Sequence, residues 1–320
     1  MRPGQPPNVS KRDGPLWSVM IPVYNCTKYV SQALDSVLSQ GFDDREMQIE
    51  VIDNCSTEGN IEDFMKERYA NISFYRQPQR VGMAANWNTC IERAKGLLVH
   101  ILHHDDFVAK GYYAEIATLA EKYPEVGLYA TRSYFVDQQS IITGVTDRVH
   151  ELEQPAKDTE PFFYSTPIQC AGVTVRRSAY EALGGFRLDL GYVTDCEMWA
   201  RVTGCHGAIV SSNVSAFYRW GDGTETHRLS RTAEVVKNIC RLNDIFARRY
   251  PSFSTERGRA RVSAIAWGQY LKFKSLGDEE AAAANRDMWV RLTPASERIV
   301  TQVEVLAKSA FRKLALRGHG

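Results

Sequence analysis

The sequence predicts an α/β protein with a mostly parallel, Rossmann-like central sheet flanked by helices and with a helical appendage at the C-terminal end. Two observations support this fold class. Short apolar runs of β-forming residues alternate with amphipathic helical stretches up to about residue 107, and the connections between them are short. From about residue 230 onward the pattern is strongly helical. Alternation of this kind is typical of parallel strands joined by helices on the faces of the sheet.

The first strand is expected at residues 17–23, because the sequence WSVMIPV is short, apolar and rich in β-forming residues. A helix follows, capped by Thr27 and closed by Gly41, in which apolar residues recur at spacings of three and four. These residues are Val30, Ala33, Leu34, Val37 and Leu38. The other elements expected in this part are strands at 47–53, 72–76 and 97–102, a helix ending at Tyr69 and a helix from Gly82 to Ala94.

After residue 107 the pattern becomes less regular. Mixed strands and loops are expected from about 126 to 175, followed by strands in the runs HGAIV and VSAFYRW. The helices expected in this part lie at 112–123, 176–183, 194–203, 260–276, 278–290 and 295–316. These patterns divide the chain into a disordered leader at 1–15, a main α/β domain at 16–228 and a helical region at 229–320.

The composition excludes several classes of protein. With 44% hydrophobic and 24% charged residues the chain matches a soluble globular protein, and a net charge of +1 gives no field that would attract nucleic acid. No apolar run approaches the roughly 20 residues of a membrane-spanning helix, and no signal peptide is recognised. The seven cysteines are scattered without a CxxC pair, so we expect reduced thiols in a cytoplasmic protein.

Polar pairs follow three of the expected strands. Tyr24-Asn25 follows the first strand, Asp53-Asn54 ends the second, and Asp105-Asp106 follows the strand at 97–102. Ligands of parallel sheets bind beyond the carboxyl ends of the strands, where these pairs would lie together. The sequence therefore predicts a ligand site at that edge of the sheet.

The adjacent carboxylates of Asp105 and Asp106 favour a divalent cation, since desolvated like charges are costly without one. Mg²⁺ takes oxygen ligands and often binds one or two carboxylates together with substrate phosphates. A solvated turn that caps the next helix is the alternative. The neighbouring His103 and His104 suggest a transition metal, but no further histidine or cysteine at ligand spacing supports this, and His100 is expected in the core.

A second acidic position lies in the run GGFRLDLGYVTDCEMWARV. Asp195 would stand in the first turn of the helix at 194–203, either as a general base for an acceptor hydroxyl or as a plain N-terminal capping charge. Glu197 points elsewhere on this helix and is the weaker candidate. The pair Gly184-Gly185 either stops the preceding helix or lets backbone approach a substrate.

In order and spacing, the runs VMIPVYN, VIDNCST, RVGMAANWN, LHHDD and GGFRLDLGYVTDCEMWARV resemble family 2 glycosyltransferases of the GT-A fold, of the bacterial type. The resemblance covers roughly residues 16–225. It implies an inverting enzyme that uses Mg²⁺ or Mn²⁺ and moves a sugar from a nucleotide-diphosphate donor to a hydroxyl acceptor, in bacterial polysaccharide or glycan synthesis. The acceptor would be a glycan or a lipid-linked molecule.

The resemblance also assigns roles to residues. Pro22, Tyr24 and Asn25 would lie against the nucleotide base and ribose, while Asp105 would contact the ribose or sugar. The residues that would read the base or approach the donor are Asp53, Asn54, Arg80, Gly82 and Asn86. Asp106 would hold the metal and Asp195 would be the catalytic base.

Three departures from the family pattern stand out. Asn54 replaces a second aspartate, so dTDP stays open beside UDP, and Thr194 replaces a glutamate. Tyr218-Arg219 is followed by Trp220-Gly221 where many relatives carry a histidine, and His227, in a polar loop, is a candidate substitute as metal ligand. The expected acceptor region comprises Gly185, Glu197, Trp199 and Trp220, of which Trp220 either stacks on a sugar ring or lies in the core.

The C-terminal residues Ile299, Val303, Leu306, Ala310 and Leu314 form an apolar stripe beside a basic cluster. This helix would either pack on the protein or a second subunit, giving a homodimer, or lie peripherally on the inner face of a membrane. Two alternative functions also stay open: a catalytically inactive sugar- or nucleotide-binding protein on the same fold, and a nucleotidyltransferase. The latter lacks its glycine- and basic-rich loop here, and a dehydrogenase would need a GxGxxG run that is absent.

Overall fold

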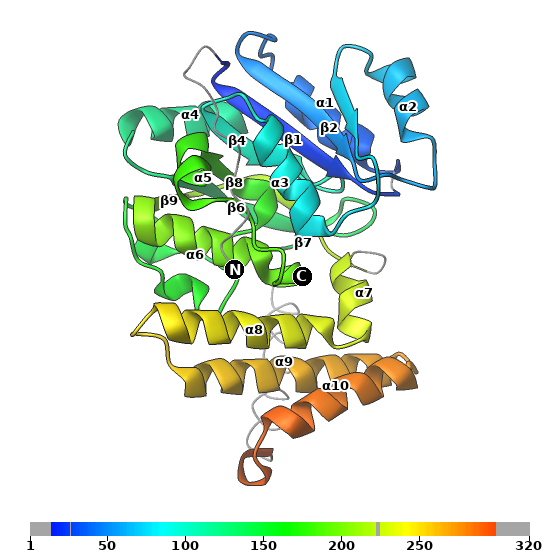
Figure 1. Cartoon of the computed structure of the whole chain (residues 1–320), viewed down its shortest axis with the longest axis vertical. Helices are drawn as coiled ribbons and strands as arrows, with labels where there is room; N and C mark the ends of the chain where they lie inside the picture. The colour runs from blue at the N-terminus through cyan, green and yellow to red at the C-terminus, as the bar shows by residue number, and fades with distance from the viewer. Residues whose placement is uncertain (1–13, 26, 222–224, 299–320) are drawn as a thin grey trace. The chain divides into compact units, whose positions relative to one another are not determined.

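The computed structural model of the chain describes residues 14–25, 27–221 and 225–298. The chain divides into two compact units, residues 1–220 and 221–320. The first unit is α/β and the second is helical in its described residues (Figure 1).

The described strands of the first unit form one mixed sheet in the order β3-β2-β1-β4-β8-β6-β9-β5, with β7 paired to β6. The strands are β1 (Trp17–Val23), β2 (Met47–Asp53), β3 (Ser73–Arg76), β4 (Leu98–Ile101), β5 (Phe107–Val108), β6 (Leu128–Val136), β7 (Ile142–Val145), β8 (Val173–Arg176) and β9 (Ala208–Arg219).

The two halves of the sheet differ in strand direction. Strands β3, β2, β1 and β4 run parallel, as the alternation of strands and helices predicts. Beyond β4 the sheet contains antiparallel pairs, β4 with β8, β8 with β6, and β9 with β5, although β6 and β9 are parallel. The fold class expected from the sequence is confirmed.

Helices cover both faces of this sheet. The helices are α1 (Val30–Leu38), α2 (Ile61–Arg68), α3 (Met83–Arg93), α4 (Tyr112–Lys122), α5 (Arg177–Leu183) and α6 (Thr194–His206). The buried faces of α1, α2 and α4 share one core cluster with alternate residues of β1, among them Val19 and Ile21. Helices α3 and α5 lie on the other face (Figure 1). The apolar face predicted for α1 is buried, except that Leu38 is exposed.

Some boundaries differ from the sequence prediction. Helix α1 begins at Val30 after Tyr29, so Thr27 does not cap it, and it ends at Leu38. Gly41 still adopts a positive φ of 81° shortly after the last turn. The two strands expected in the runs HGAIV and VSAFYRW are one continuous strand, β9, which pairs with β6 on both sides of an irregularity at residues 211–213.

The second unit contains the helices α7 (Glu225–Arg231), α8 (Glu234–Arg249), α9 (Thr255–Ser275) and α10 (Glu279–Leu292). One apolar stripe of α8 is buried: Val235, Ile239, Leu242 and Phe246. Ser254 and Asp278 cap the starts of α9 and α10 with their side-chain oxygens. The amphipathic stripe at 299–314, with its membrane or subunit contact, lies outside the described residues, as does most of the leader at 1–15.

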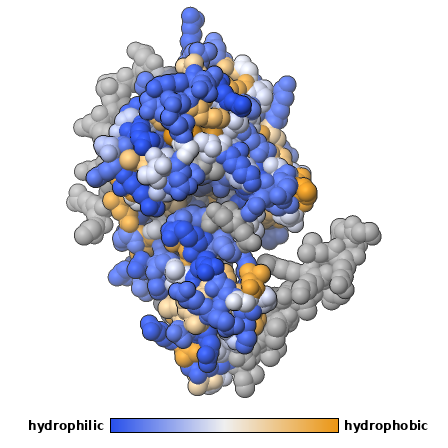
Figure 2. All heavy atoms as spheres, turned by 90° about the vertical axis from the view of Figure 1, so that its right-hand side faces the viewer, coloured by the Kyte–Doolittle hydropathy of each residue, from blue (hydrophilic) through white to orange (hydrophobic). Residues whose placement is uncertain are grey.

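Among the described residues no helix combines the length and the apolar character needed to cross a bilayer. On the face of the molecule seen in Figure 2, hydrophobic residues are scattered among hydrophilic ones. All six cysteines in the described part of the chain are free thiols, as the sequence predicts.

Candidate active site

The polar pairs predicted at the strand ends do lie along one edge of the sheet. Val23, the last residue of β1, pairs in register with Asp53, the last residue of β2. On the other side of β1, the Leu102 N–H donates to the Met20 carbonyl, so the residues after β4 come level with the end of β1. Two turns therefore stand at this edge: the β2 turn, residues 53–58, and the β4 turn, residues 103–106.

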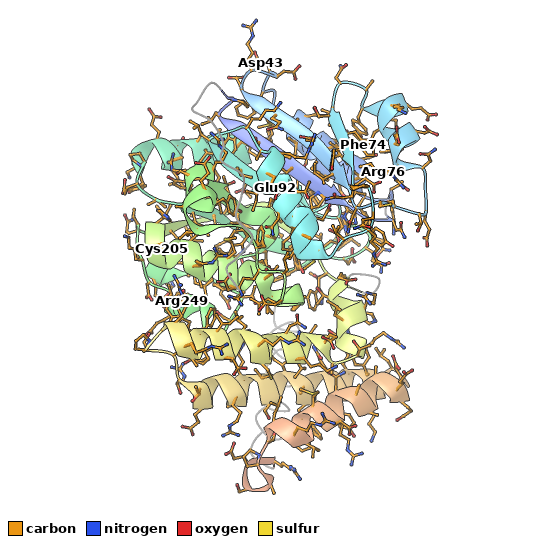
Figure 3. All side chains as sticks on the ribbon, viewed as in Figure 1. Asp43, Phe74, Arg76, Glu92, Cys205 and Arg249 are labelled. Carbon is orange, nitrogen blue, oxygen red and sulfur yellow. The ribbon has the colours of Figure 1, made fainter. Side chains whose placement is uncertain are left out.

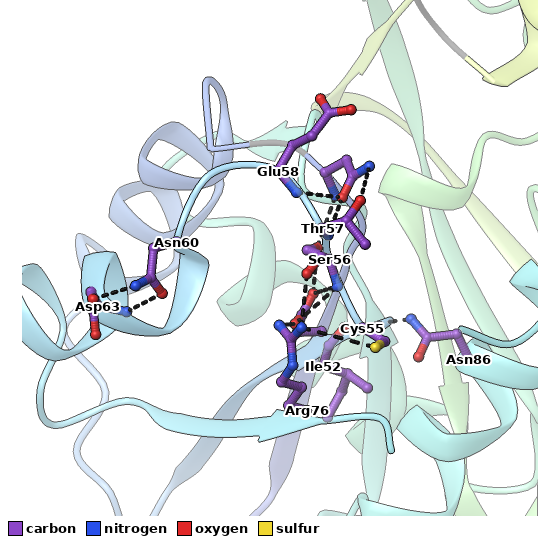
Figure 4. Close-up of polar contacts among 11 residues, drawn as sticks. Ile52, Cys55, Ser56, Thr57, Glu58, Asn60, Asp63, Arg76 and Asn86 are labelled. Carbon is purple, nitrogen blue, oxygen red and sulfur yellow. Dashed lines mark hydrogen bonds and ion pairs between the residues drawn. The ribbon is translucent and has the colours of Figure 1, made fainter. Parts of the chain in front are cut away.

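In the β2 turn, the Asp53 carboxylate is fully buried and saturated with donors. One oxygen accepts from the N–H of Ser56 at 3.1 Å and from its hydroxyl, and the other accepts from the Arg76 guanidinium at 2.5 Å. Arg76 reaches this position from the end of β3 and also donates to the Ser56 carbonyl (Figures 3 and 4). Asp53 thus closes its own turn, and its negative charge is balanced by Arg76 from the neighbouring strand β3.

Asn25 ties the first strand to the same turn. Its side-chain oxygen accepts from the N–H groups of Thr57 at 2.8 Å and Glu58 at 3.2 Å, and its own N–H donates to Ser56 Oγ. Asn25 adopts a positive φ of 50°, a conformation that asparagine tolerates better than most residues. Cys55 also has a positive φ, 58°, a backbone conformation that glycine adopts more readily than other residues.

Asn54 forms a two-way latch with the loop before α3. Its Nδ2 donates to the Val81 carbonyl and its Oδ1 accepts from the Val81 N–H, both at 2.9 Å. An aspartate could accept here but could not donate, so the departure from the family pattern has a structural reason. The latch places Arg80, whose guanidinium lies 4.3 Å from the Tyr24 ring centroid, and Gly82, the N-cap of α3.

The remaining expected donor residues are placed as follows. Asn86 is buried on α3, where it accepts from Gln77 and donates to the Ile52 carbonyl, so its amide holds the helix to the sheet (Figure 4). Pro22 is buried in β1, and its carbonyl lies 3.3 Å from His104 Nδ1. Of the donor candidates, Arg80 and Gly82 are exposed, whereas Tyr24, Asn25 and Asp105 are half-buried.

The β4 turn is of a different character. Asp106 is 1% exposed, and its Oδ1 accepts the Arg219 N–H at 2.8 Å, but its Oδ2 is buried without a hydrogen-bond partner among the described residues. Burial and the neighbouring Asp105 charge raise the pKa of the Asp106 carboxyl well above its usual range. This turn therefore holds a carboxylate that a cation would stabilise.

Arg219, at the end of β9, anchors the β4 turn. Its Nε donates to the Asp105 carbonyl at 2.9 Å, and its terminal nitrogens donate to Gln32, Ser140 and the Asp137 carbonyl. Its guanidinium also lies 4.0 Å from the Tyr29 ring centroid. The arginine is only 3% exposed, so its function is to fix the turn rather than to contact a ligand. In the sequence, the only sign of this role was an arginine near the end of the expected strand VSAFYRW.

His103 stands opposite Asp106 across the turn. Its Nδ1 lies 3.8 Å from Asp106 Oδ2, and ligand atoms of His103, Asp105 and Asp106 all lie within 4.8 Å of one another. Burial lowers the pKa of His103 to about 4, so the imidazole is neutral at physiological pH. Two carboxylates and a neutral imidazole are a donor set that fits a divalent cation, and the partnerless Oδ2 of Asp106 gives it an anchoring atom.

Asp195 lies in the first turn of α6, as predicted, and is half-buried. Its Oδ1 accepts from the Cys196 N–H at 2.7 Å. Burial raises the pKa of its carboxyl to about 6. The buried thiol of Cys170 links Asp195 to the β4 turn: after burial, the negative charges of Asp195 and Asp106 are the causes that raise its pKa. Both carboxylates are therefore near enough to Cys170 for their charges to act on it.

The rest of the expected acceptor region is mostly internal. Glu197 is 4% exposed and forms an ion pair with Arg201 at 2.9 Å, while Trp199 is buried edge-on against Phe186. Arg201 in turn donates to the carbonyls of residues 183–185 at the end of α5. Glu197 and Trp199 are therefore occupied by contacts inside the protein. Neither side chain is available to contact an acceptor.

Gly185 is required by packing against α3 rather than by a substrate. A Cβ on Gly185 would lie 2.2 Å from Asn88 Oδ1, and the Asn88 amide holds both the N–H and the carbonyl of Phe186. Gly184 ends α5 with a positive φ of 82°. Of the two interpretations open for this glycine pair, the helix stop is observed. The close backbone approach at Gly185 is to Asn88 of the protein itself and not to a substrate.

Trp220 and His227 remain. Trp220 is 49% exposed, so the alternative of a core tryptophan is wrong, and its backbone N–H donates to the Val136 carbonyl at the end of β6. His227 lies on helix α7 of the second unit rather than in a polar loop, with its ring 5.8 Å from that of Phe273. No described contact makes it a metal ligand.

Comparison with known proteins gives a consistent result. Residues 18–184, more than half of the chain, match the model of the glycosyl transferase family 2. An uncharacterised protein of Mycobacterium tuberculosis is 27% identical over 71% of this chain and 74% of its own length. An uncharacterised glycosyltransferase of Mycoplasma pneumoniae is 29% identical over 32% of this chain, which spans only 35% of that relative.

Solved structures are similar in fold. A mannosyltransferase of Pyrobaculum calidifontis, in complex with GDP-mannose and Mn²⁺, aligns with a TM-score of 0.57 over 98% of this chain and 89% of its own, at 18% identity. TarS of Staphylococcus aureus, residues 1–349 in complex with UDP-GlcNAc, aligns with a TM-score of 0.55 over 86% of this chain and 79% of its own, at 15% identity.

Proposed function

Because the chain belongs to glycosyl transferase family 2, we propose that it transfers a sugar from a nucleotide-diphosphate donor to a hydroxyl of a glycan or lipid-linked acceptor. The proposed reaction is metal-dependent and inverts the anomeric configuration. One observation carries the proposal: the buried Asp106, at the ligand edge of the sheet, has an oxygen without a partner among the described residues, and the charge of Asp195, whose own pKa is raised to about 6, acts with that of Asp106 on the same buried thiol, Cys170.

The donor would bind across the two turns. In this arrangement Tyr24 and Arg80, which already stack on each other, offer an aromatic face and a cation to the nucleotide. Asp53 and Asn54 act indirectly, because their polar atoms are occupied in holding the β2 turn and the Val81 loop. Asp105, half-buried in the β4 turn, would contact the ribose or the sugar with one carboxylate oxygen and leave the other for the cation.

The cation would be held by Asp106 and Asp105. When bound, Mg²⁺ or Mn²⁺ supplies positive charge beside the diphosphate as it leaves. The protein's own contribution is to fix these carboxylates, because Arg219 holds the β4 turn from β9 through the Asp106 carboxylate and the Asp105 carbonyl.

Asp195 would act as the general base. A pKa of about 6 leaves its carboxylate ionised at neutral pH but more basic than an ordinary aspartate. It takes the proton of the acceptor hydroxyl while that oxygen bonds to the anomeric carbon from the face opposite the diphosphate. The bond from this carbon to the diphosphate oxygen breaks, and its electron pair leaves with the nucleotide diphosphate. The exposed Trp220 offers a face on which a sugar ring could stack.

The nucleotide is left open between uridine, deoxythymidine and guanosine. TarS was solved with UDP-GlcNAc and the mannosyltransferase with GDP-mannose, while Asn54, which motivated the dTDP alternative, is occupied by the Val81 latch. A set of UDP-, dTDP- and GDP-sugars should therefore be offered to the full-length protein.

The test measures release of nucleotide diphosphate from each donor, with water as the acceptor, in the presence of Mn²⁺ or Mg²⁺ and of a chelator. We expect slow release from one donor, only with metal. Binding of a nucleotide sugar without any release, even with a panel of glycan acceptors, would favour the alternative of a catalytically inactive binding protein. Release of pyrophosphate from a nucleoside triphosphate and a sugar phosphate would favour a nucleotidyltransferase.

A further inference from the structure

His103 occupies a position that the family resemblance does not explain. It stands two residues after the end of β4, and its carbonyl accepts the Asp106 N–H at 3.1 Å, which closes the β4 turn. This local bond brings the two side chains to the same side of the turn. We propose that His103 is a ligand of the divalent cation, and that its imidazole biases the site toward Mn²⁺ over Mg²⁺. This inference rests on the proposed function.

The ring of His103 is held in place by α3. It stacks on Trp87 with the ring centroids 4.7 Å apart and the planes 26° apart. Trp87 is itself 5% exposed and packs edge-on against Phe186. A ring held on one face by a buried tryptophan has little rotamer freedom to lose, so ligation by it would cost little entropy.

The distance between the two facing atoms fits a shared ion. Nδ1 of His103 and Oδ2 of Asp106 are 3.8 Å apart, too far for a hydrogen bond. Two ligands that each stand about 2.1 Å from one metal ion lie at most about 4.2 Å apart, so one ion can contact both. An oxygen of Asp105 lies within 4.8 Å of both atoms, so a small rotation of this half-buried side chain would make it the third protein ligand.

The hydrogen bonding of the turn leaves Asp106 Oδ2 for a ligand. This oxygen is buried and has no hydrogen-bond partner among the described residues. Because no donor in the described part of the chain faces His103 Nε2, that nitrogen can carry the ring hydrogen while Nδ1 presents its lone pair to the ion. A buried carboxylate oxygen without a partner is rare in proteins, and one that faces the Nδ1 of a neighbouring imidazole indicates a missing bound group.

The chemistry of the donor set gives the preference. Mg²⁺ takes oxygen ligands in near-ideal octahedral geometry, whereas imidazole suits transition metals. Replacing one oxygen ligand by a histidine nitrogen therefore penalises Mg²⁺ more than Mn²⁺. The phosphates of the donor and water would complete the coordination in either case.

The direct test is spectroscopic and uses the full-length protein with Mn²⁺ and UDP, or GDP if that nucleotide binds. Electron spin echo envelope modulation should show a nitrogen coupled to Mn²⁺. The coupling should be lost in His103→Asp and kept in His104→Gln, the control at the adjacent histidine. A nitrogen coupling that survives in His103→Asp, or none in the parent protein with Mn²⁺ bound, would overturn the inference.

A second measurement covers the metal preference. Titration calorimetry should show that His103→Asp lowers the ratio of Mn²⁺ affinity to Mg²⁺ affinity at least about tenfold. Loss of a residue that only hydrogen-bonds to a metal ligand already costs roughly 10- to 100-fold in metal affinity, and loss of a ligand nitrogen should cost Mn²⁺ no less. His103→Asn, which keeps a polar side chain of similar size, guards against misfolding. An unchanged affinity ratio with intact nucleotide binding would refute the assignment of His103 as a ligand and leave the proposed function standing. Failure of the parent protein to bind any nucleotide would instead sink the proposed function.

Discussion

The β2 turn and the β4 turn stand side by side at the same edge of the sheet, yet they use their polar groups in opposite ways. In the β2 turn both oxygens of Asp53 and both amide atoms of Asn54 are occupied by donors and acceptors of the protein. In the β4 turn Asp106 and His103 each keep one buried polar atom without a partner among the described residues. An acidic residue at a strand end is thus not evidence of a ligand until its hydrogen bonds are known. The β2 turn is structural, whereas the β4 turn has a carboxylate oxygen left to bind a cation.

The largest effect is expected for the group that would do the chemistry. Asp195→Asn should lower nucleotide diphosphate release by about a thousandfold, because a positioned base contributes roughly 10²–10⁴-fold, while nucleotide binding stays intact. Release can be followed by chromatography and binding by thermal shift. Asp189→Asn, at an exposed aspartate paired with Arg187, is the matched control and should keep its rate. A normal rate in Asp195→Asn would remove the base assignment.

The parent enzyme should also show the raised pKa of Asp195 in its pH profile. Since this carboxyl has a pKa of about 6 in the folded protein, its ionised, proton-accepting form is lost as the pH falls through that value. The rate should then decline about tenfold per pH unit below that point. Measuring initial rates between about pH 5 and 8 at saturating metal would show it, and a limb near the ordinary aspartate pKa of about 4 would contradict it.

The next effect separates the two turns directly. Asp106→Asn should abolish the increase in melting temperature that Mn²⁺ and nucleotide give together. Without ligands, the variant should melt no lower than the parent in mildly alkaline buffer. The pKa of Asp106 is raised, so the stability its protonated form contributes is lost as pH rises, and the amide avoids that loss while its oxygen still accepts from Arg219. A marked drop in the melting temperature would mean that Asp106, like Asp53, is a structural carboxylate.

The same exchange in the β2 turn should have the opposite outcome. Asp53→Asn loses the charge that balances Arg76 and weakens the bonds to Ser56, which should cost about 2 kcal/mol of unfolding free energy. The response to metal should persist. Urea denaturation provides the measurement, with Glu58→Gln, an exposed position in the same turn, as the control. Equal stability of Asp53→Asn and the parent would refute the view of this turn as a support.

The smallest effect concerns the latch. Asn54→Asp restores the family's residue but removes the donor to the Val81 carbonyl and places a charge against it. We expect a loss of about 1 kcal/mol of stability, and a weaker affinity for nucleotide because Arg80 is less well placed. Calorimetry with UDP tests the second part. Tighter nucleotide binding in Asn54→Asp would show that this position faces the donor after all.

The sequence by itself determined the parallel half of the sheet, the helices that flank it and the edge where a ligand site would lie. Alternating apolar runs and strand-end polar residues such as Asp53 and Asp105 are local features, and local periodicity indicates which segments form strands and helices, although not where each begins and ends. The family follows from the sequence as well, because residues 18–184, which include the runs from VMIPVYN to LHHDD, match the family model.

Only the tertiary structure decided which polar atoms the protein uses for itself. Asn54 holds a loop 27 residues away, Arg219 holds a turn 113 residues away, and Arg201 donates to carbonyls 16 to 18 residues away. In the sequence no further metal ligand stood at the expected spacing from His103. The folded β4 turn brings the carboxylates of Asp105 and Asp106 close to its ring, which is held by stacking on Trp87. Hydrogen bonds are satisfied between partners that meet only on folding, so the bonding capacity left for a ligand is a property of the folded chain and cannot be read from spacing.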